Sequence, residues 1–209
     1  MLKTFVSIFV IVNPIGAIPV FLSLAPGAGA PERSRVAARA ATAATCVLLA
    51  SALAGEAALR FFGIGVPSFR VGGGILVLLI AVDMLLARPS RARSTPEESA
   101  EAGGREDIAV VPLAVPLLAG PGAISAVILH AEQAGALADR LVLNGAILLV
   151  GIVSWVALRL AVPIGARLGA TGINVLTRLM GLILAAIAVE FLAAGVRDLL
   201  PALAVGAAR

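Results

Sequence analysis

Long apolar blocks, rather than amphipathic stripes, dominate the pattern of hydrophobic and polar positions along the chain. The six blocks cover residues 4–24, 38–62, 70–88, 108–130, 141–163 and 176–197. A helix needs about 20 predominantly apolar residues to cross a bilayer, so each block is long enough to span it with some tilt. The pattern therefore predicts an all-α membrane protein with six transmembrane helices.

The two halves of the chain resemble each other in sequence. The segment GILVLLIAVDM, which begins at Gly74, recurs 107 positions later as GLILAAIAVEF, which begins at Gly181. The tripeptide GAI at residues 16–18 recurs at residues 122–124, within one residue of the same offset. Because each half holds three spans, the second copy must insert upside down relative to the first. The sequence thus predicts two inverted three-helix repeats, an arrangement found in many secondary transporters.

A polar stretch joins the two halves. Residues 89–107 contain arginine and glutamate in mixed order between the third and fourth blocks, as expected of a solvated linker. The predicted organisation is a first repeat over residues 1–88, this linker, and a second repeat over residues 108–209, within one integral membrane domain. The similarity is weaker between the second and fifth blocks, where the tripeptide ALR recurs with an offset of 99.

Proline and glycine interrupt the first and fourth blocks at corresponding places. The residues concerned are Asn13, Pro14 and Gly16 in the first block, and Gly120, Pro121, Gly122 and Ser125 in the fourth. Proline removes a backbone donor, and backbone groups freed in lipid need protein, water or a ligand as a partner. We therefore expect helices 1 and 4 to be broken, with N–H groups near Gly16 and Gly122 presented to a carboxylate. The alternative is a pair of ordinary proline kinks used for packing.

Each repeat also places one carboxylate inside an apolar run. Asp83 and Glu190 occupy matching positions, and an ionised carboxylate at the bilayer centre costs at least about 2.5 kcal/mol. The two acids are therefore candidates for proton or cation coupling. The alternative is an interfacial acid paired with a neighbouring arginine, since Arg88 follows Asp83 by five residues and Arg197 follows Glu190 by seven.

Basic residues are distributed unevenly between the two ends of the predicted spans. With the N-terminus outside, the cytoplasmic side holds Arg33, Arg35, Arg39, Arg88, Arg91, Arg93, Arg105, Arg159, Arg167 and Arg178. The opposite side holds Lys3, Arg60, Arg70, Arg140, Arg197 and Arg209. By the positive-inside rule, this asymmetry predicts a multi-pass protein of the cell inner (cytoplasmic) membrane with both termini in the periplasm.

Composition narrows the function classes. With 60% hydrophobic and 13% charged residues, the chain belongs in lipid, and its net charge of +4 comes mostly from arginines at span ends rather than from a nucleic-acid interface. The lone Cys46 cannot form an internal disulfide or a CxxC pair, and we expect it to be a small apolar core residue. Glu56 and Arg60, four residues apart, are expected to form a structural ion pair.

Catalytic constellations are absent from the sequence. Ser125 and His130 are five residues apart, a spacing that does not bring a nucleophile and its base together on one helix face, and His130 is expected at the membrane edge. The sequence contains no zinc-binding motif. We therefore expect no enzyme activity, and no cofactor other than Na⁺ or H⁺ as a coupling ion.

Four segments together resemble the MarC family of small integral membrane proteins. They are NPIGAIPVF in the first block, GILVLLIAVDML in the third, VPLAVPLLAGPGAIS in the fourth and GINVLTRLMGLILAAIAVEF in the sixth. The resemblance covers nearly the whole chain and implies a relation to amino-acid exporters of the LysE type, with small neutral amino acids such as glycine and alanine as substrates of some members. It also implies that both proline–glycine interruptions lie on broken helices. Ala119 stands at the place aligned with Asn13, so a symmetric pair of asparagine ligands is not available.

The expected function is secondary transport of small neutral amino acids of the glycine and alanine class, coupled to H⁺ or Na⁺, by alternating access around the paired broken helices. The first alternative is a non-transporting structural or regulatory membrane protein. An intramembrane enzyme is a third reading, against which the missing catalytic residues argue. The expected partners are the amino acid and the lipid bilayer, with no nucleic acid, while the oligomeric state does not follow from the sequence.

Overall fold

The structure, a computed structural model, describes residues 2–24, 29–86, 113–114 and 117–200. Its helices are α1 (Leu2–Val12), α2 (Ile18–Leu24), α3 (Ala30–Phe61), α4 (Val66–Leu85), α6 (Pro121–Gln133), α7 (Leu137–Arg159) and α8 (Ala161–Leu199). The described residues form no β-strand, and four of their helices, α3, α4, α7 and α8, are long and apolar enough to cross a membrane. The prediction of an all-helical membrane protein is therefore confirmed.

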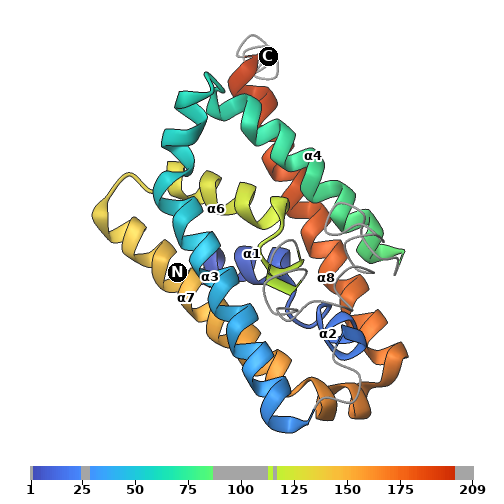
Figure 1. The fold of residues 1–209 in the computed structure, drawn as a ribbon. Helices are drawn as coiled ribbons and strands as arrows, with labels where there is room; N and C mark the ends of the chain where they lie inside the picture. Colours follow the sequence, from blue (N-terminus) through green and yellow to red (C-terminus); the bar gives the residue numbers. More distant parts are fainter. Residues whose placement is uncertain (1, 25–28, 87–112, 115–116, 201–209) are drawn as a thin grey trace.

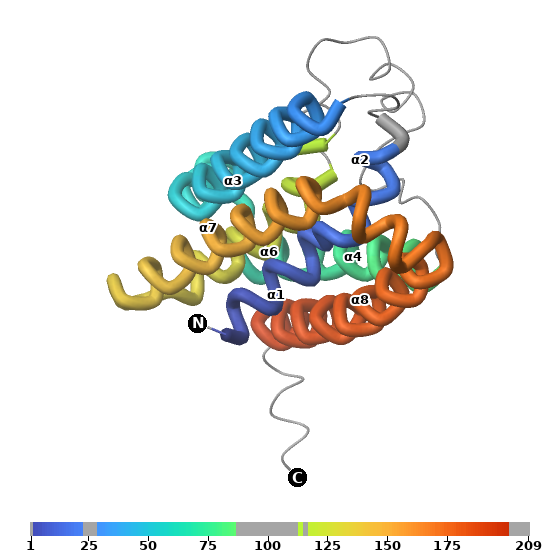
Figure 2. Tube along the Cα trace, turned by 90° about the horizontal axis from the view of Figure 1, so that it is seen from below, coloured from blue at the N-terminus to red at the C-terminus, as the bar shows by residue number. Residues whose placement is uncertain are grey.

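Two pairs of long helices frame the shorter helices (Figure 1). α3 packs along α7 and α4 packs along α8, while α1, α2 and α6 lie between the two pairs. Figure 2, turned by 90°, shows α1 between α7 and α8. The long helices also expose large apolar side chains on their outer sides, such as Leu79, Ile152 and Leu182. Helices that are apolar on all sides suit a lipid environment.

The crossing of α4 and α8 is close because glycines on each helix face the backbone of the other. A Cβ atom added at Gly74 would lie 3.2 Å from the carbonyl oxygen of Ala188. A Cβ atom added at Gly181 would lie 3.1 Å from the carbonyl oxygen of Ala81. Later positions on α4 thus meet earlier positions on α8, so the two helices run antiparallel. Small residues permit such close approach between membrane helices.

Two helices begin earlier than the hydropathy pattern predicts. α3 starts at Ala30 rather than near residue 38, and α8 starts at Ala161 rather than near residue 176. The additional segment of α3 is APERSRVA, with two alanines and two arginines, which favour helix in water as well as in lipid, so this helix continues beyond its apolar block. Gly169, with φ at 62°, bends α8 within its additional segment. Glycine adopts this left-handed conformation without steric cost.

The first predicted span is broken into two short helices, and the fourth is described only in part. α1 has 11 residues and α2 has 7, so their lengths of about 17 and 10 Å each fall short of a hydrocarbon core of about 30 Å. In the fourth block, α6 begins at Pro121, and most of the preceding residues lie outside the described ones, as does the predicted linker 89–107. The six-span arrangement and the division into two repeats thus stay predictions.

Candidate functional site

The helix of the first apolar block breaks at Asn13. α1 ends at Val12 and α2 begins at Ile18, while Asn13 is buried and has φ at 48°. Asparagine tolerates this left-handed conformation better than most side chains. Its Oδ1 accepts a hydrogen bond from the Gly16 N–H at 3.1 Å, and its backbone oxygen accepts one from the Ala17 N–H at 3.3 Å. In this conformation, Asn13 itself accepts the hydrogen bonds of N–H groups that we expected to face a carboxylate.

The second break lies just before α6 and has no such cap. Gly120 is extended, with φ at −74° and ψ at 171°, and among the described residues no side chain forms a capping hydrogen bond at this helix start. Ala119, aligned with Asn13, carries a methyl group that cannot accept one. The first turn, with the N–H groups of Gly122 and Ala123, is therefore an uncapped helix N-terminus. Such an end favours an anion through its N–H groups and the helix dipole.

The two breaks pack against the same stretch of α4, in the middle of the molecule (Figure 1). The Asn13 amide nitrogen lies 3.9 Å from the sulfur of Met84, and a Cβ atom at Gly122 would lie 2.8 Å from Cδ1 of Ile80. Ile80 and Met84 are one helical turn apart, or about 6 Å along α4. The same Cβ would lie 3.9 Å from Ile11. The C-terminal end of α1 therefore lies beside the N-terminal end of α6.

The buried polar groups beside the breaks are uncharged. Among the described residues, the buried polar and charged ones are Asn13, Arg70, Ser125 and Ser154. Ser125 lies on α6 and faces Gly73, where an added Cβ atom would be 3.0 Å from the Cβ of the serine. Ser154 lies on α7 and Arg70 near the start of α4, away from the breaks. The junction of the breaks thus offers hydrogen-bonding groups without a buried charge in the described part of the chain.

Asp83 and Glu190 lie at different heights of the α4–α8 crossing. Asp83 is half-buried at the height of Gly181, whereas Glu190 is exposed at the height of Gly74. Nine residues separate Gly74 from Asp83, which is about 13 Å along α4. Neither acid forms an ion pair with a described residue, so the alternative pairing of Glu190 with Arg197 is not seen. The arginine expected beside Asp83 lies outside the described residues.

A charged cluster that the sequence pattern did not predict joins three helices. Nη1 of Arg70 on α4 lies 2.7 Å from Oδ2 of Asp198 on α8, and its Nη2 lies 3.0 Å from Oε2 of Glu132 on α6. The Arg70 side chain is 11% exposed, and its Nε is buried without a hydrogen-bond partner. The two acids are 128 and 62 positions from Arg70. In the sequence, all three residues of the cluster lie at the ends of predicted spans, and this shared location was the signal that could have indicated it.

The structure also places Glu56, Arg60, Cys46 and His130. Glu56 and Arg60 form the expected ion pair, at 2.7 Å. Cys46 is exposed on the outer side of α3, so the expectation of a core residue is wrong, because a membrane helix has no need to bury its small residues from lipid. His130 Nε2 lies 3.1 Å from the hydroxyl oxygen of Ser7 on α1. Within the described residues, no group of three or more histidine, cysteine, aspartate or glutamate residues is placed to hold a metal ion.

Comparison with known proteins covers nearly the whole chain. Residues 1–200 match the family described as MarC family integral membrane protein. The chain is 38% identical over 201 residues to the UPF0056 membrane protein YhcE of Escherichia coli (strain K12), covering 96% of this chain and 94% of that protein. It is 43% identical over 196 residues to the UPF0056 membrane protein MJ1677 of Methanocaldococcus jannaschii, covering 94% and 95% respectively.

No solved structure matches the chain. The family therefore follows from sequence, and the helices described above add the long apolar spans expected of it. Both the family match and the relatives extend almost from end to end. This integral, multi-pass membrane protein belongs to the MarC family, as its sequence motifs predicted.

Proposed function

We propose that the protein is a secondary transporter of small neutral amino acids, of the glycine and alanine class, which bind where the two helix breaks meet. The observation that carries the proposal is the approach of the end of α1 to the uncapped start of α6 against one stretch of α4. Secondary transporters commonly bind substrate at paired discontinuous helices near the middle of the membrane.

The charges of a zwitterionic amino acid match these two helix ends. The carboxylate faces the N–H groups of Gly122 and Ala123, and the ammonium faces the last carbonyl groups of α1, since the two ends carry opposite partial charges. Asn13 and Ser125 supply buried polar atoms but no charge, which favours a substrate without net charge. A Cβ atom at Gly122 would lie 2.8 Å from Cδ1 of Ile80, and such close packing favours a substrate with a small side chain.

The prolines and glycines of the two motifs prevent a regular helix at the proposed site. Pro14 and Pro121 lack the N–H that a continuous helix would use, so neither segment closes into one uninterrupted helix. A Cβ atom at Gly16 would collide with the Asn13 amide, so glycine at this position lets the Asn13 side chain fold back onto the break. When substrate binds, the Asn13 side chain exchanges its hydrogen bond to the backbone for one to the ligand.

Asp83 is the better candidate for coupling transport to H⁺ or Na⁺. It precedes Met84, whose sulfur contacts Asn13, so it lies near the first break. Glu190 lies farther along the molecule, towards the end that holds Arg70. It precedes Asp198, the partner of Arg70, by eight residues, or about 12 Å along α8. If the halves exchange roles between the two states of alternating access, Glu190 takes the corresponding position in the opposite state.

Reciprocal contacts support two inverted repeats. The offset of 107 relates Gly74 to Gly181 and Ala81 to Ala188. Gly74 faces Ala188 while Gly181 faces Ala81, so each helix makes the same contact with its counterpart. Such reciprocity is what a two-fold axis between equivalent elements produces. Because α4 and α8 run antiparallel, this axis lies across the helices, as in the inverted repeats of transporters.

Thermal stabilisation of the purified protein by glycine or alanine tests the site. Gly122→Leu places a side chain against Ile80 at the α6 start and is expected to abolish the stabilisation. Gly195→Leu is the matched control, because a Cβ atom at Gly195 would lie 2.7 Å from Val71 of α4 and so overpacks a helix contact away from the breaks. Equal stabilisation of wild type and Gly122→Leu would place the amino acid elsewhere.

Flux separates transport from the non-transporting alternative. Proteoliposomes containing the wild-type chain are expected to take up labelled alanine with saturation, and those containing Gly122→Leu are not. Binding without saturable flux would instead favour a regulatory membrane protein that senses the amino acid.

A further inference from the structure

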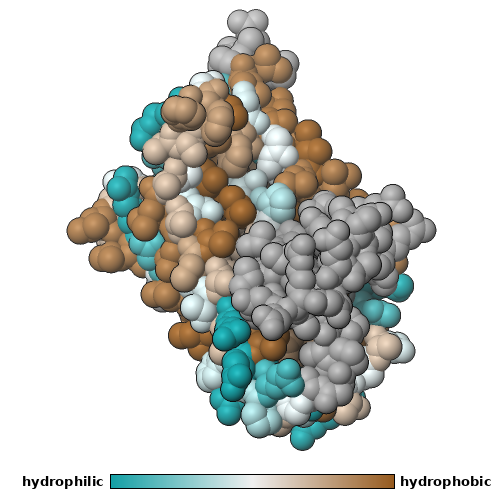
Figure 3. All heavy atoms as spheres, in the orientation of Figure 1, coloured by the Kyte–Doolittle hydropathy of each residue, from teal (hydrophilic) through white to brown (hydrophobic). Residues whose placement is uncertain are grey.

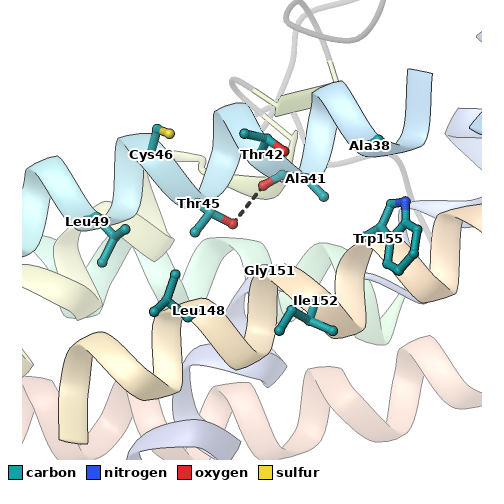
Figure 4. A pocket seen from close by; sticks show the side chains of 10 residues that line it. All are labelled: Ala38, Ala41, Thr42, Thr45, Cys46, Leu49, Leu148, Gly151, Ile152 and Trp155. Atoms are coloured by element: carbon teal, nitrogen blue, oxygen red, sulfur yellow. Dashed lines mark hydrogen bonds between the residues drawn. The ribbon is translucent and has the colours of Figure 1, made fainter. Parts of the chain in front are cut away.

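A groove of about 450 Å³ runs along the outer side of the α3–α7 pair, away from the helix breaks (Figure 4). α3 contributes Ala38, Thr42, Cys46 and Leu49, and α7 contributes Leu148 and Trp155. Its floor is narrow where Gly151 lies directly against Thr45. The volume lies within the range of about 300–1,000 Å³ typical of ligand pockets, and nearly all of the lining is apolar.

The groove has the length of one leaflet. Its ends on α3, Ala38 and Leu49, are 11 positions apart, or about 16 Å, which is half of a hydrocarbon core of about 30 Å. Leu148 at one end is the middle residue of α7 (Leu137–Arg159), and Trp155 lies one turn from the end of that helix. If α7 spans the bilayer from end to end, the groove extends from the middle of the membrane to one of its surfaces.

The surface end of the groove is aromatic and basic. The Arg159 guanidinium lies 5.3 Å from the centre of the Trp155 ring. Arg35 precedes Ala38 by three residues, so the helical period places it on the groove side of α3, and Glu32, the acid of this helix start, lies one turn farther from the groove. Hydrophilic side chains gather at the end of the molecule where α3 begins (Figure 3). Tryptophan and arginine are typical of the membrane–water interface.

We infer that this groove binds an anionic phospholipid. One acyl chain lies along the apolar wall from Trp155 to Leu148, and the phosphate lies beside Arg35 and Arg159. Arginine recognises phosphate with paired hydrogen bonds, and basic pockets between membrane helices bind anionic headgroups. A zwitterionic lipid offers the same chains, but its ammonium group meets the same arginines unfavourably. The site is separate from the proposed amino-acid site and does not depend on it.

Trp155 reports occupancy directly, because it is the single tryptophan of the chain. The full chain is reconstituted in phosphatidylcholine vesicles that contain equal mole fractions of brominated phosphatidylglycerol or brominated phosphatidylcholine. Bromine on the acyl chain quenches tryptophan on contact, and each quenching ratio is taken against the unbrominated lipid. One arginine near an anionic headgroup favours binding about fivefold, so we expect phosphatidylglycerol to be preferred at least that strongly.

Three variants separate the charge from the groove. Arg35→Gln combined with Arg159→Gln is expected to reduce the preference to about one, while Arg159→Lys retains part of it. Thr42→Phe fills the groove without changing any charge, and it is expected to weaken quenching by both brominated lipids. Arg60→Gln, at the other end of α3, is the control and should keep the wild-type preference.

Equal quenching of wild type by the two brominated lipids would overturn the inference. A phosphatidylglycerol preference that survives Thr42→Phe unchanged would also overturn it, because the lipid would then bind outside the groove. The inference would also be wrong if a second copy of the chain, rather than a lipid, covers this face. Since Cys46 is the single cysteine, a disulfide-linked dimer that forms readily in the membrane, with weak quenching by both lipids, would reveal that copy.

Discussion

At the scale of single residues, Asn13 holds the first helix break in its shape. Its left-handed backbone and its hydrogen bond to Gly16 both depend on the asparagine side chain. Asn13→Ala loses the hydrogen bond and leaves a strained backbone, so we expect the free energy of unfolding to fall by about 2 kcal/mol. Asn13→Gly relieves the strain and should cost about half as much. Unfolding in detergent measures both, and equal losses would show that the backbone conformation is unimportant.

The two membrane acids are expected to differ in their effect on transport. Asp83 lies near the first break and is half-buried, whereas Glu190 is exposed at the opposite height of the crossing. Asp83→Asn should therefore reduce alanine flux into proteoliposomes more than Glu190→Gln, with at least one acid required for dependence of the flux on pH or Na⁺. A double variant with the wild-type dependence would remove both acids from the mechanism.

At the scale of helices, the close crossing of α4 and α8 rests on its glycines. A side chain at Gly181 meets the backbone of α4, where the Ala81 oxygen and the Leu85 nitrogen would each lie 3.1 Å from its Cβ. Gly181→Leu is therefore expected to lower the free energy of unfolding by about 1–3 kcal/mol through overpacking. Gly72→Leu meets open space and should be neutral or slightly stabilising. Similar losses in both variants would show that the crossing does not need a small residue.

Arg70 forms ion pairs that link the start of α4 and the end of α8 to α6. Its removal in Arg70→Gln leaves the Glu132 and Asp198 carboxylates without their shared counter-ion. Because Asp198 is 45% exposed, water screens part of the effect, and we expect a loss of about 1–3 kcal/mol in unfolding free energy. Arg60→Gln, which breaks an exposed pair within α3, should cost less than about 0.5 kcal/mol. Equal losses would mean that the three-helix cluster adds nothing.

Elements and contacts differ in how far the sequence predicts them. The apolar blocks and the interruption at Asn13 follow from local rules, because lipid demands apolar residues and proline prevents a continuous helix. The apolar blocks did not predict where α3 and α8 begin, because a helix can continue beyond the membrane. The partners of Arg70 come from two distant helices, so no local pattern identifies them. The neighbouring placement of Gly122 and Ile11 likewise required the packing of three helices.

At the scale of the whole molecule, contacts from α1, α4 and α6 meet at the end where α8 finishes. Ser7 contacts His130, two residues before Glu132, and Arg70 links Glu132 to Asp198 near the end of α8. Acids balance the basic residues at this end, as in the ion pairs of Arg60 and Arg70. The opposite end, where α3 begins and α7 ends, carries an excess of arginine. The basic residues there are Arg33, Arg35, Arg39, Arg159 and Arg167, with Glu32 as the acid of the α3 start.

This asymmetry predicts that the termini face the periplasm and that the arginine-rich end faces the cytoplasm. A reporter active only in the cytoplasm should be inactive when fused after Arg209 and active when fused after Arg105. Changing Arg33, Arg35 and Arg39 together to glutamine should produce a mixed population, because it removes charge from the end that is retained inside. Cytoplasmic activity after Arg209 in the wild-type chain would reverse the orientation. The groove beside Arg159 would then open to the outer leaflet, although its lipid preference would not change.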